Sequence, residues 1–600
     1  MMARYVQDGA SLSGARYKYP FYFDHPTTIR SGYFVPIFAD SYVAPGSTYN
    51  LNFEGFIRAL PMTRPPMGDL EMFVGAWYVP HRINWTEFKE HFGENNLTAW
   101  TGNYSIERPK VLVSTELDAS PYALGIGAFT GLPYGYVSGS HVLPDSLWQS
   151  LGSTDYFGAN WSSIHLGQYF GYPVYASDDD VSGKLKVEAL KARAYASIWN
   201  EFIRDQNLQA PILFLKTTST LGSEDAVLRQ MLDFVPAPIN KVHDLFTGVL
   251  PNPQKASTTV KLPMGDAAPI SFTSNILGTS NLGHTVARKE TDGTNVNVTS
   301  GTVGFSASQM LGTVAGTANT ALQLDNSQNL YVDLRNATGA NISDFRNAVI
   351  VQHYYETLAQ FGSKYYEIAQ AIWNTRPSNV REDLPEGCGF ITFPINIQAV
   401  TSHAATSGQP LGYQAAKSET YHRQDSMFTY TTKEHGTLMI CCGIRQARHV
   451  YTNRMSRDFF DFDLFSEVNP LFVGSSDVPV YKTEVDASGY IGSLGAVVEE
   501  KPDAVLGYQE YGYQEKFQVS YASGLLNPHV TGALSDFTMA DAYNSTVSLS
   551  PSFVIEDPNF IGRSFVSNAP FAAQFVCDFK ITGSVTRVLA PKTVPGLTRI

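Results

Sequence analysis

The residue types that could build a metal-binding site are few in this 600-residue chain, and their spacing is unfavourable. The four cysteines include an adjacent pair, Cys441 and Cys442, with His435 and His449 nearby. Zinc sites hold Cys and His at spacings such as C-x-x-C and H-x-x-x-H, and neither spacing occurs here. We therefore expect no metal at this cluster, and we interpret the cysteines as buried free thiols in a reducing compartment.

Carboxylates suggest two further candidate sites, a calcium-binding loop and a catalytic acid pair, and the spacing of the residues argues against both. Residues 178–183 read D-D-D-V-S-G, the first half of a calcium-binding loop, but Ala189 stands where the bidentate Glu would be. Glu499 and Glu500 are adjacent in sequence, whereas glycoside hydrolysis needs two carboxylates facing each other across a sugar. The G-x-S-x-G, P-loop, G-x-G-x-x-G and H-E-x-x-H patterns are all missing. We expect no catalytic residue and no cofactor, and hence no enzyme.

The composition favours a β-rich protein that buries surface against neighbours. Charged residues make up only 16% of the chain, while Tyr and Phe number 33 and 36, a bias typical of protein interfaces. A secreted β-rich enzyme could share this profile. The net charge of −13 argues against a chain that binds nucleic acid over its whole surface, because phosphate affinity comes from Lys and Arg. The first 14 residues lack the basic start and apolar core of a secretion signal.

Strands and two helices are the elements expected to position any site. Apolar and polar residues alternate over 48–57 and 575–585, which predicts half-buried strands, and the nearly continuous apolar run 70–79 predicts a strand covered on both faces. The spacing over 189–204 predicts an amphipathic helix, and a second helical signal lies within 330–373. The buried face expected of the first helix carries Tyr195, Ile198, Trp199, Phe202 and Ile203.

Two long intervals lack a sustained period. Residues 95–188 form the first, and with the helix that follows they belong to a long insertion expected over 95–243. Residues 271–328 are dominated by Thr, Ser, Gly, Asn and Ala, which favours either exposed turn-rich structure or a flexible linker.

Several motifs, in order along the chain, carry a resemblance to a known family. Residues 193–208 contain R-A-Y followed by N-E-x-x-R-D-x-N-L, and residues 246–255 read F-T-x-x-L-P-x-P-Q-K. Residues 434–436 read E-H-G, and residues 590–597 contain A-P followed by P-G-L. This series resembles the major capsid proteins of the Microviridae, small icosahedral phages with single-stranded DNA, and their gokushovirus-like branch in particular.

The resemblance implies a fold and an assembly. The expected fold is mainly β, an eight-stranded antiparallel viral jelly-roll whose long interstrand insertions carry a few helices. Residues 1–600 would form one capsid domain, with an N-terminal arm at 1–23, a variable surface insertion at 271–328 and a C-terminal tail at 586–600. Copies would close into a T=1 icosahedral shell around a circular single-stranded DNA genome, assembled in the bacterial host cytoplasm.

The resemblance also implies partners. They are a small basic DNA-binding protein that neutralises most of the genome, a DNA pilot protein, an internal scaffolding protein and a host surface receptor, the last contacted through residues 271–328. The shell itself offers only local cations in the arm and the tail, for which ordinary solvated surface residues are the competing interpretation. The genome-facing candidates are Arg4, Arg16, Lys18, Arg587, Lys592 and Arg599.

An alternative function is a secreted β-sandwich that binds or cleaves carbohydrate. It would need a secretion route, a facing carboxylate pair and a concave aromatic platform, and the sequence displays none of the three.

Overall fold

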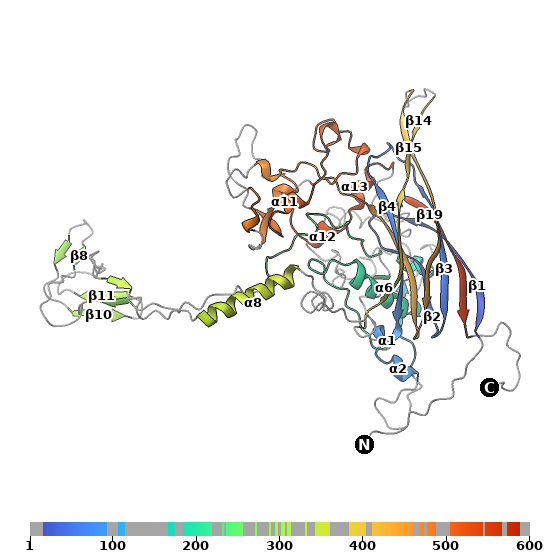
Figure 1. Cartoon of the computed structure of the whole chain (residues 1–600), viewed down its shortest axis with the longest axis horizontal. Helices are drawn as coiled ribbons and strands as arrows, with labels where there is room; N and C mark the ends of the chain where they lie inside the picture. The colour runs from blue at the N-terminus through green and yellow to red at the C-terminus, as the bar shows by residue number, and fades with distance from the viewer. Residues whose placement is uncertain are drawn as a thin grey trace, which may run out of the picture. The chain divides into compact units, whose positions relative to one another are not determined.

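Two antiparallel sheets pack face to face around one large apolar core (Figure 1). The first contains, in spatial order, β1 (Tyr17–Ile29), β19 (Phe575–Arg587), β3 (Thr48–Ala59), β15 (Gln414–Thr431) and β14 (Ile397–Thr401). The second contains β13 (Glu386–Ile395), β4 (Leu70–Pro80), β16 (Gly436–Gln446) and β2 (Val35–Val43). This mainly β, antiparallel architecture is the jelly-roll that was expected.

The computed structural model describes the chain in segments. They are 16–92, 106–114, 166–173, 184–218, 228, 231–232, 236–255, 270–272, 287–289, 295–297, 302–306, 309–313, 330–332, 342–360, 383–403, 411–459, 467–472, 477–487, 504–543, 547–566 and 573–588.

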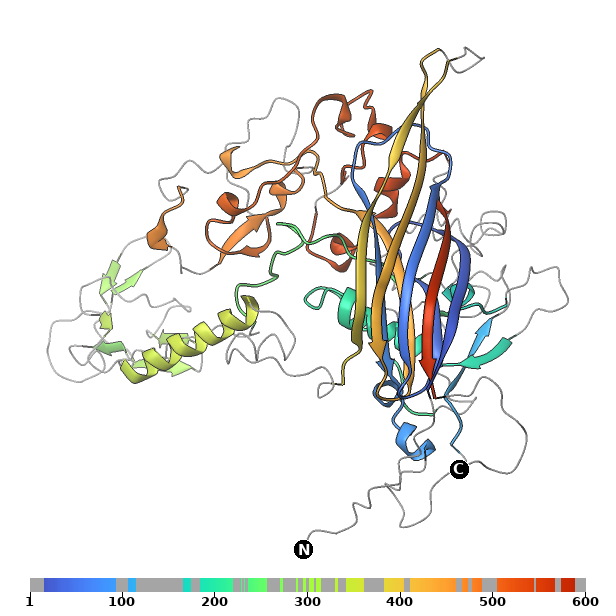
Figure 2. The same cartoon turned by 45° about the vertical axis from the view of Figure 1, so that its right-hand side comes forward.

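The two sheets hold nine strands in this described part, one more than the eight expected. The extra strand, β14, pairs only with the first residues of β15, from Gln414 to Ser418. Figure 2 shows this hairpin extending beyond the other strands of the sheet. It therefore lengthens one edge of the first sheet without adding to the packed sandwich.

Alternation of side chains explains the first sheet. Along β3, Tyr49, Leu51, Phe53 and Ile57 are fully buried, while the intervening positions point to solvent. β19 alternates in the same way, so both predicted half-buried strands are confirmed. One face of this sheet therefore supplies the core, and the other carries polar side chains.

The second sheet is covered on both faces, as the apolar run 70–79 predicted. Residues 74–80 of β4 and nearly all of β16 are buried. Cys441 and Cys442, adjacent in β16, are therefore both buried. All four cysteines are free thiols as expected, but Cys388 is only partly buried, so the expectation of burial was wrong at that residue. Trp77 of β4 is completely buried among aromatic rings on the face of this sheet away from the sandwich core.

The predicted helix at 189–204 covers that face. It consists of α6 (Leu190–Ile198), which continues directly into a π-helix, η2 (Trp199–Ile203). Tyr195 donates a hydrogen bond to the carbonyl of Phe34 in the loop before β2, at 2.6 Å. Phe202 was expected on the buried face, and this was wrong because its side chain is 41% exposed. The wider π-helical turn shifts the phase of every residue that follows it.

Short elements connect the strands. Between β4 and the π-helix lie α1 (His81–Asn84), α2 (Phe88–His91), β5 (Lys110–Ser114), α5 (Leu166–Tyr169) and β6 (Lys184–Glu188), with β5 and β6 paired. After β16 the chain forms one pair of strands, β17 (Val478–Tyr481) and β18 (Val505–Gln509), and three short α-helices, α11 (Tyr513–Lys516), α12 (Pro551–Val554) and α13 (Pro558–Gly562). The same region contains the 3-10 helices η4 (Arg457–Phe459), η6 (Pro470–Phe472), η7 (Lys482–Glu484), η8 (Gly524–Leu526) and η9 (Ser535–Phe537). Together with residues 245–249, these later connections build a second apolar cluster that includes Phe246, Tyr451 and Tyr513.

The chain divides into two compact units, and the second comprises residues 254–358. It contains three strand pairs and all but the last two residues of the helix α8 (Ile342–Gln360), which falls within the predicted helical region 330–373. The pairs are β7 (Ile270–Phe272) with β12 (Leu330–Val332), β8 (Ala287–Lys289) with β9 (Asn295–Asn297), and β10 (Thr302–Ser306) with β11 (Gln309–Thr313). The β7–β12 pair thus flanks the interval 271–328 that the sequence marks as an insertion. The expectation of one domain over 1–600 stays a prediction.

Within the described residues, none of the helices has the length and apolar character needed to cross a membrane.

Candidate nucleic-acid interface

The solvent face of the first sheet is built by register between strands distant in sequence. Pro20 of β1 lies opposite Ser584 of β19, which in turn lies opposite Asn50 of β3. Side chains alternate between the two faces along each strand, and these residues occupy the positions that face solvent. Their side chains therefore stand on the same face of the sheet. A row of small uncharged groups therefore crosses the sheet, and Lys18 lies on the same face, two residues along β1 from Pro20.

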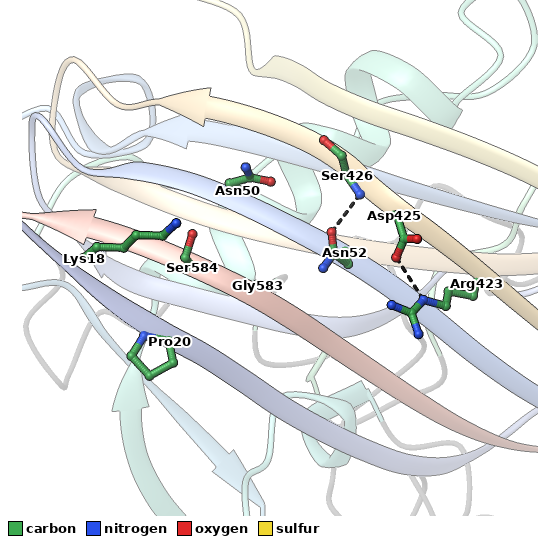
Figure 3. Close-up of a pocket in the computed structure, with 9 residues that line it drawn as sticks. All are labelled: Lys18, Pro20, Asn50, Asn52, Arg423, Asp425, Ser426, Gly583 and Ser584. Carbon is green, nitrogen blue, oxygen red and sulfur yellow. Dashed lines mark hydrogen bonds and ion pairs between the residues drawn. The ribbon is translucent and has the colours of Figure 1, made fainter.

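A shallow depression on this face, the polar pocket, collects these side chains from four strands (Figure 3). It is lined by Lys18, Pro20, Asn50, Asn52, Arg423, Asp425, Ser426, Gly583 and Ser584.

One end of the polar pocket is set by an irregularity in β15. The register of β15 against β3 shifts between Gln424 and Phe428, and Ser426 adopts a positive φ of 55°. The backbone N–H of Ser426 donates to Oδ1 of Asn52 at 2.7 Å, which holds the bulge against β3. Arg423 donates to Asp425 at 2.9 Å and lies 3.4 Å from Glu54. At this end the cation and the carboxylates neutralise one another.

The floor of the pocket requires glycine at position 583. Its φ is +144°, and a Cβ there would lie 2.2 Å from the carbonyl oxygen of Asn50. β19 and β3 therefore approach closely at a point where no side chain projects.

Three of the six genome-facing candidates fall in the described part of the chain. Arg16 and Lys18 are both exposed, and Lys18 lines the polar pocket. Arg587 lies opposite Tyr17 at the end of β19, but it is already engaged: its guanidinium donates to the hydroxyl of Tyr49 at 2.8 Å and lies 3.4 Å from Asp40. Arg4, Lys592 and Arg599 lie outside the described residues.

Sequence reasoning missed most of the pocket. The alternation over 48–57 already placed Asn50 and Asn52 on a solvent face, so these two lining residues could have been identified from the sequence. Arg423 and Ser584 could not be joined to them, because the pairings that bring them together span hundreds of residues.

A second group of polar residues is buried and joins four loop segments. Nζ of Lys241 donates to Oδ2 of Asp541 at 2.6 Å. His449 lies between two carboxylates, with Nδ1 at 3.3 Å from Asp541 and Nε2 at 3.3 Å from Glu556. All four side chains are almost completely buried. This buried charge network has no access to a substrate, and its geometry suits the joining of loops.

The pKa of His449 follows from these contacts. Burial alone disfavours the charged imidazolium, but the hydrogen bonds and charges of Asp541 and Glu556 outweigh it and raise the pKa to about 9. Because this value lies above that of the unfolded chain, about 6.5, protonated His449 stabilises the fold fully below pH 6.5. This contribution is lost as the pH rises through 9.

We therefore expect the free energy of unfolding to fall between pH 6.5 and pH 9.5, by on the order of 3 kcal/mol from this group. Urea unfolding at a series of pH values measures it. The buried thiols also lose stabilisation at high pH, so the difference between wild type and His449→Gln isolates the imidazole. Parallel pH profiles for the two proteins would contradict the assignment.

Within the described residues, no group of three or more His, Cys, Asp and Glu side chains is arranged to hold a metal ion. The calcium-like segment 178–183, which the sequence already argued against, lies outside the described residues.

Comparison with known proteins covers almost the whole chain. Residues 11–112 and 159–597 match a family described as "Capsid protein (F protein)". Capsid protein VP1 of Spiroplasma virus 4 is 27% identical over 592 residues, covering 96% of this chain and 94% of that protein. Capsid protein VP1 of Chlamydia phage 1 is 24% identical with the same coverage, and that of Bdellovibrio phage phiMH2K is 24% identical over 98% of this chain and 96% of its own length.

Proposed function

The chain belongs to the Capsid protein (F protein) family of phages, and from this premise we propose that its copies assemble into a T=1 icosahedral shell around a circular single-stranded DNA genome. As a capsid protein it is a component of the virion, and its family implies a shell of identical subunits. The family also indicates a structural role rather than catalysis.

Exposed apolar side chains support self-assembly. Large hydrophobic residues stand exposed on several connecting segments, and contact with another surface would remove their apolar area from water. Leu471 is 88% exposed and Leu213 is 73% exposed, and Tyr521 is exposed to a similar degree. Neighbouring copies of the same chain are the natural cover, and a shell buries such residues by symmetry.

The acidic net charge of the chain implies that another molecule neutralises most of the genome. With a net charge of −13, the shell cannot neutralise the phosphates, so a small basic DNA-binding protein would supply most of the positive charge. A DNA pilot protein, an internal scaffolding protein and a host receptor contacted through residues 271–328 complete the proposed set of partners. Assembly would take place in the bacterial host cytoplasm.

Local phosphate contacts would come from cations near the two ends of the chain, of which Lys18 lies in β1 and Arg587 in β19 rather than in a separate arm or tail. Lys18 and Arg16 are exposed and suited to this role, whereas Arg587 already shares its guanidinium with Asp40 and Tyr49. Arg4, Lys592 and Arg599 stay candidates on the basis of sequence.

Negative-stain microscopy of the purified protein tests the proposal. We expect uniform shells, with nuclease-protected single-stranded DNA in shells taken from infected cells. Single subunits that bind a polysaccharide would instead favour a carbohydrate-binding β-sandwich.

Three single variants, Leu471→Asp, Leu213→Asp and Tyr521→Asp, probe the apolar contacts. At least one should abolish shells while leaving the free energy of unfolding of the subunit within about 0.5 kcal/mol of wild type, since exposed side chains contribute little to the monomer. Lys417→Asp, at an exposed position of β15 in the first sheet, is the control for added negative charge. If all three variants form normal shells, these residues do not lie at subunit contacts.

A further inference from the structure

We propose that the polar pocket binds a phosphate of the single-stranded DNA backbone, with Lys18 supplying the charge and Asn50 and Ser584 the hydrogen bonds. This inference rests on the proposed function and adds the place and manner of contact. Lys18 is the one residue of the site that the sequence already marks as genome-facing.

The groups at this end of the pocket are available to a ligand. No side-chain hydrogen bond or ion pair joins Lys18, Asn50 or Ser584 to any other residue in the part of the chain that the structure describes. An ammonium, an amide and a hydroxyl supply hydrogen-bond donors of the kind that phosphate oxygens accept. Such groups, set on neighbouring strands, can hold an anion without a cluster of arginines.

Charge favours this end of the pocket over the other. Asp425, the acidic lining residue, is bound by Arg423, which Glu54 also contacts. Figure 3 shows Lys18 beside Ser584, separated along the sheet from the Arg423–Asp425 pair. Elsewhere on this face Glu419 is paired with Lys417 at 2.6 Å and Asp578 with Lys580 at 3.8 Å. Asp24 of β1 also stands on this face and accepts a hydrogen bond from the hydroxyl of Tyr22 at 2.5 Å. The unpaired cation of the pocket therefore lies at Lys18.

The lining chemistry fits a sugar–phosphate backbone better than bases or glycans. None of the nine lining residues is aromatic, so the pocket offers no platform on which a base could stack. A glycan site would need a comparable ring surface. Gly583 keeps the floor free of side chains, so a chain can cross the sheet there. Contact with phosphate alone positions a strand without reading its sequence.

The sheet makes the site rigid. β1, β19 and β3 are hydrogen-bonded along their whole shared length, with Lys18 opposite Thr586 and Ser584 opposite Asn50. The backbone positions that carry the three donors are therefore fixed relative to one another before DNA arrives, which limits the backbone entropy lost on binding.

Fluorescence anisotropy of labelled oligothymidine with the full-length, unassembled subunit tests the site. Lys18→Gln should weaken binding roughly tenfold, as expected for a lost charged hydrogen bond. It should also reduce the slope of log affinity against log salt by about 0.7. The double variant Asn50→Ala/Ser584→Ala should weaken binding several-fold with the slope unchanged, because it removes donors without removing charge.

Lys417→Gln is the matched control, since it removes the same charge from the same sheet at a lysine already paired with Glu419. It should leave both affinity and slope as in wild type. All of these positions face solvent, and urea unfolding verifies that each variant is folded.

Three results would overturn the inference. Equal effects of Lys18→Gln and Lys417→Gln would show general charge rather than a site. Wild-type affinity in both pocket variants would place the DNA elsewhere. Binding of a polysaccharide that depends on the pocket residues, with no such dependence for oligothymidine, would assign the pocket to a glycan. The DNA content of shells is measured separately, so the pocket can fail while genome enclosure stands.

Discussion

Replacing Asp541 by alanine is expected to lower the free energy of unfolding by about 3 to 5 kcal/mol, the range for breaking a buried ion pair. Asp541 is fully buried and accepts from Nζ of Lys241 at 2.6 Å, and its other oxygen faces His449 at 3.3 Å. Its removal leaves a buried ammonium without its carboxylate. Urea unfolding of the subunit at pH 7 measures the change.

A surface pair provides the control for this variant. Asp578 lies 3.8 Å from Lys580 and is 41% exposed, so Asp578→Asn should cost less than about 1 kcal/mol. The double variant Lys241→Met/Asp541→Asn should recover part of the loss, because it removes both buried charges together. If Asp541→Ala cost no more than the surface variant, the network would not be what joins the loops.

Truncating Trp77 to alanine is expected to cost a similar 3 to 5 kcal/mol, through lost burial and the cavity left behind. The indole contacts four rings, with centroid distances of 5.6 Å to Phe34, 6.1 Å to Phe73, 6.0 Å to Phe202 and 5.4 Å to Phe390. It therefore ties the second sheet to the helix that covers it. Urea unfolding again supplies the measurement.

Phe390→Ala is the matched control, because Phe390 belongs to the same ring cluster but is 50% exposed. Its loss should be clearly smaller, on the order of 1 to 2 kcal/mol. Gly75→Ala is an independent check because it adds volume beside the indole instead of removing it. A Cβ at position 75 would lie 2.3 Å from the Trp77 ring, so this variant should also lower the free energy of unfolding. Equal losses for Trp77→Ala and Phe390→Ala would mean that the ring cluster does not anchor the sheet.

Periodicity of apolar side chains along the sequence predicted the local elements of the fold. The strands at 48–57, 70–79 and 575–585 and the helix at 189–204 follow from side-chain alternation and helical spacing, and the structure has all four. Phe202 was misplaced because a π-helical turn leaves no simple mark on a 3.6-residue pattern.

The polar pocket and the buried charge network depend on long-range register, which periodicity does not encode. Lys241 meets Asp541 across 300 residues, and partners in β1 and β19 are 546 to 570 residues apart. Lys18 could be named as a cation on an arm, but its neighbours Asn50 and Ser584 could be found only once the strands were paired. Family resemblance supplied the jelly-roll and the capsid role, which composition alone left open against a carbohydrate-binding protein.

The position of β19 has a consequence for biosynthesis. This strand follows all the others in sequence, yet it lies inside the first sheet, with β1 on one side and β3 on the other. Until the ribosome has delivered it, β1 and β3 each present an unpaired edge, the kind of surface on which chains aggregate. Closure of the sandwich must therefore be a late, slow event dominated by contacts between distant residues. A crowded infected cell would accordingly favour chaperones or early binding partners that shield those two edges.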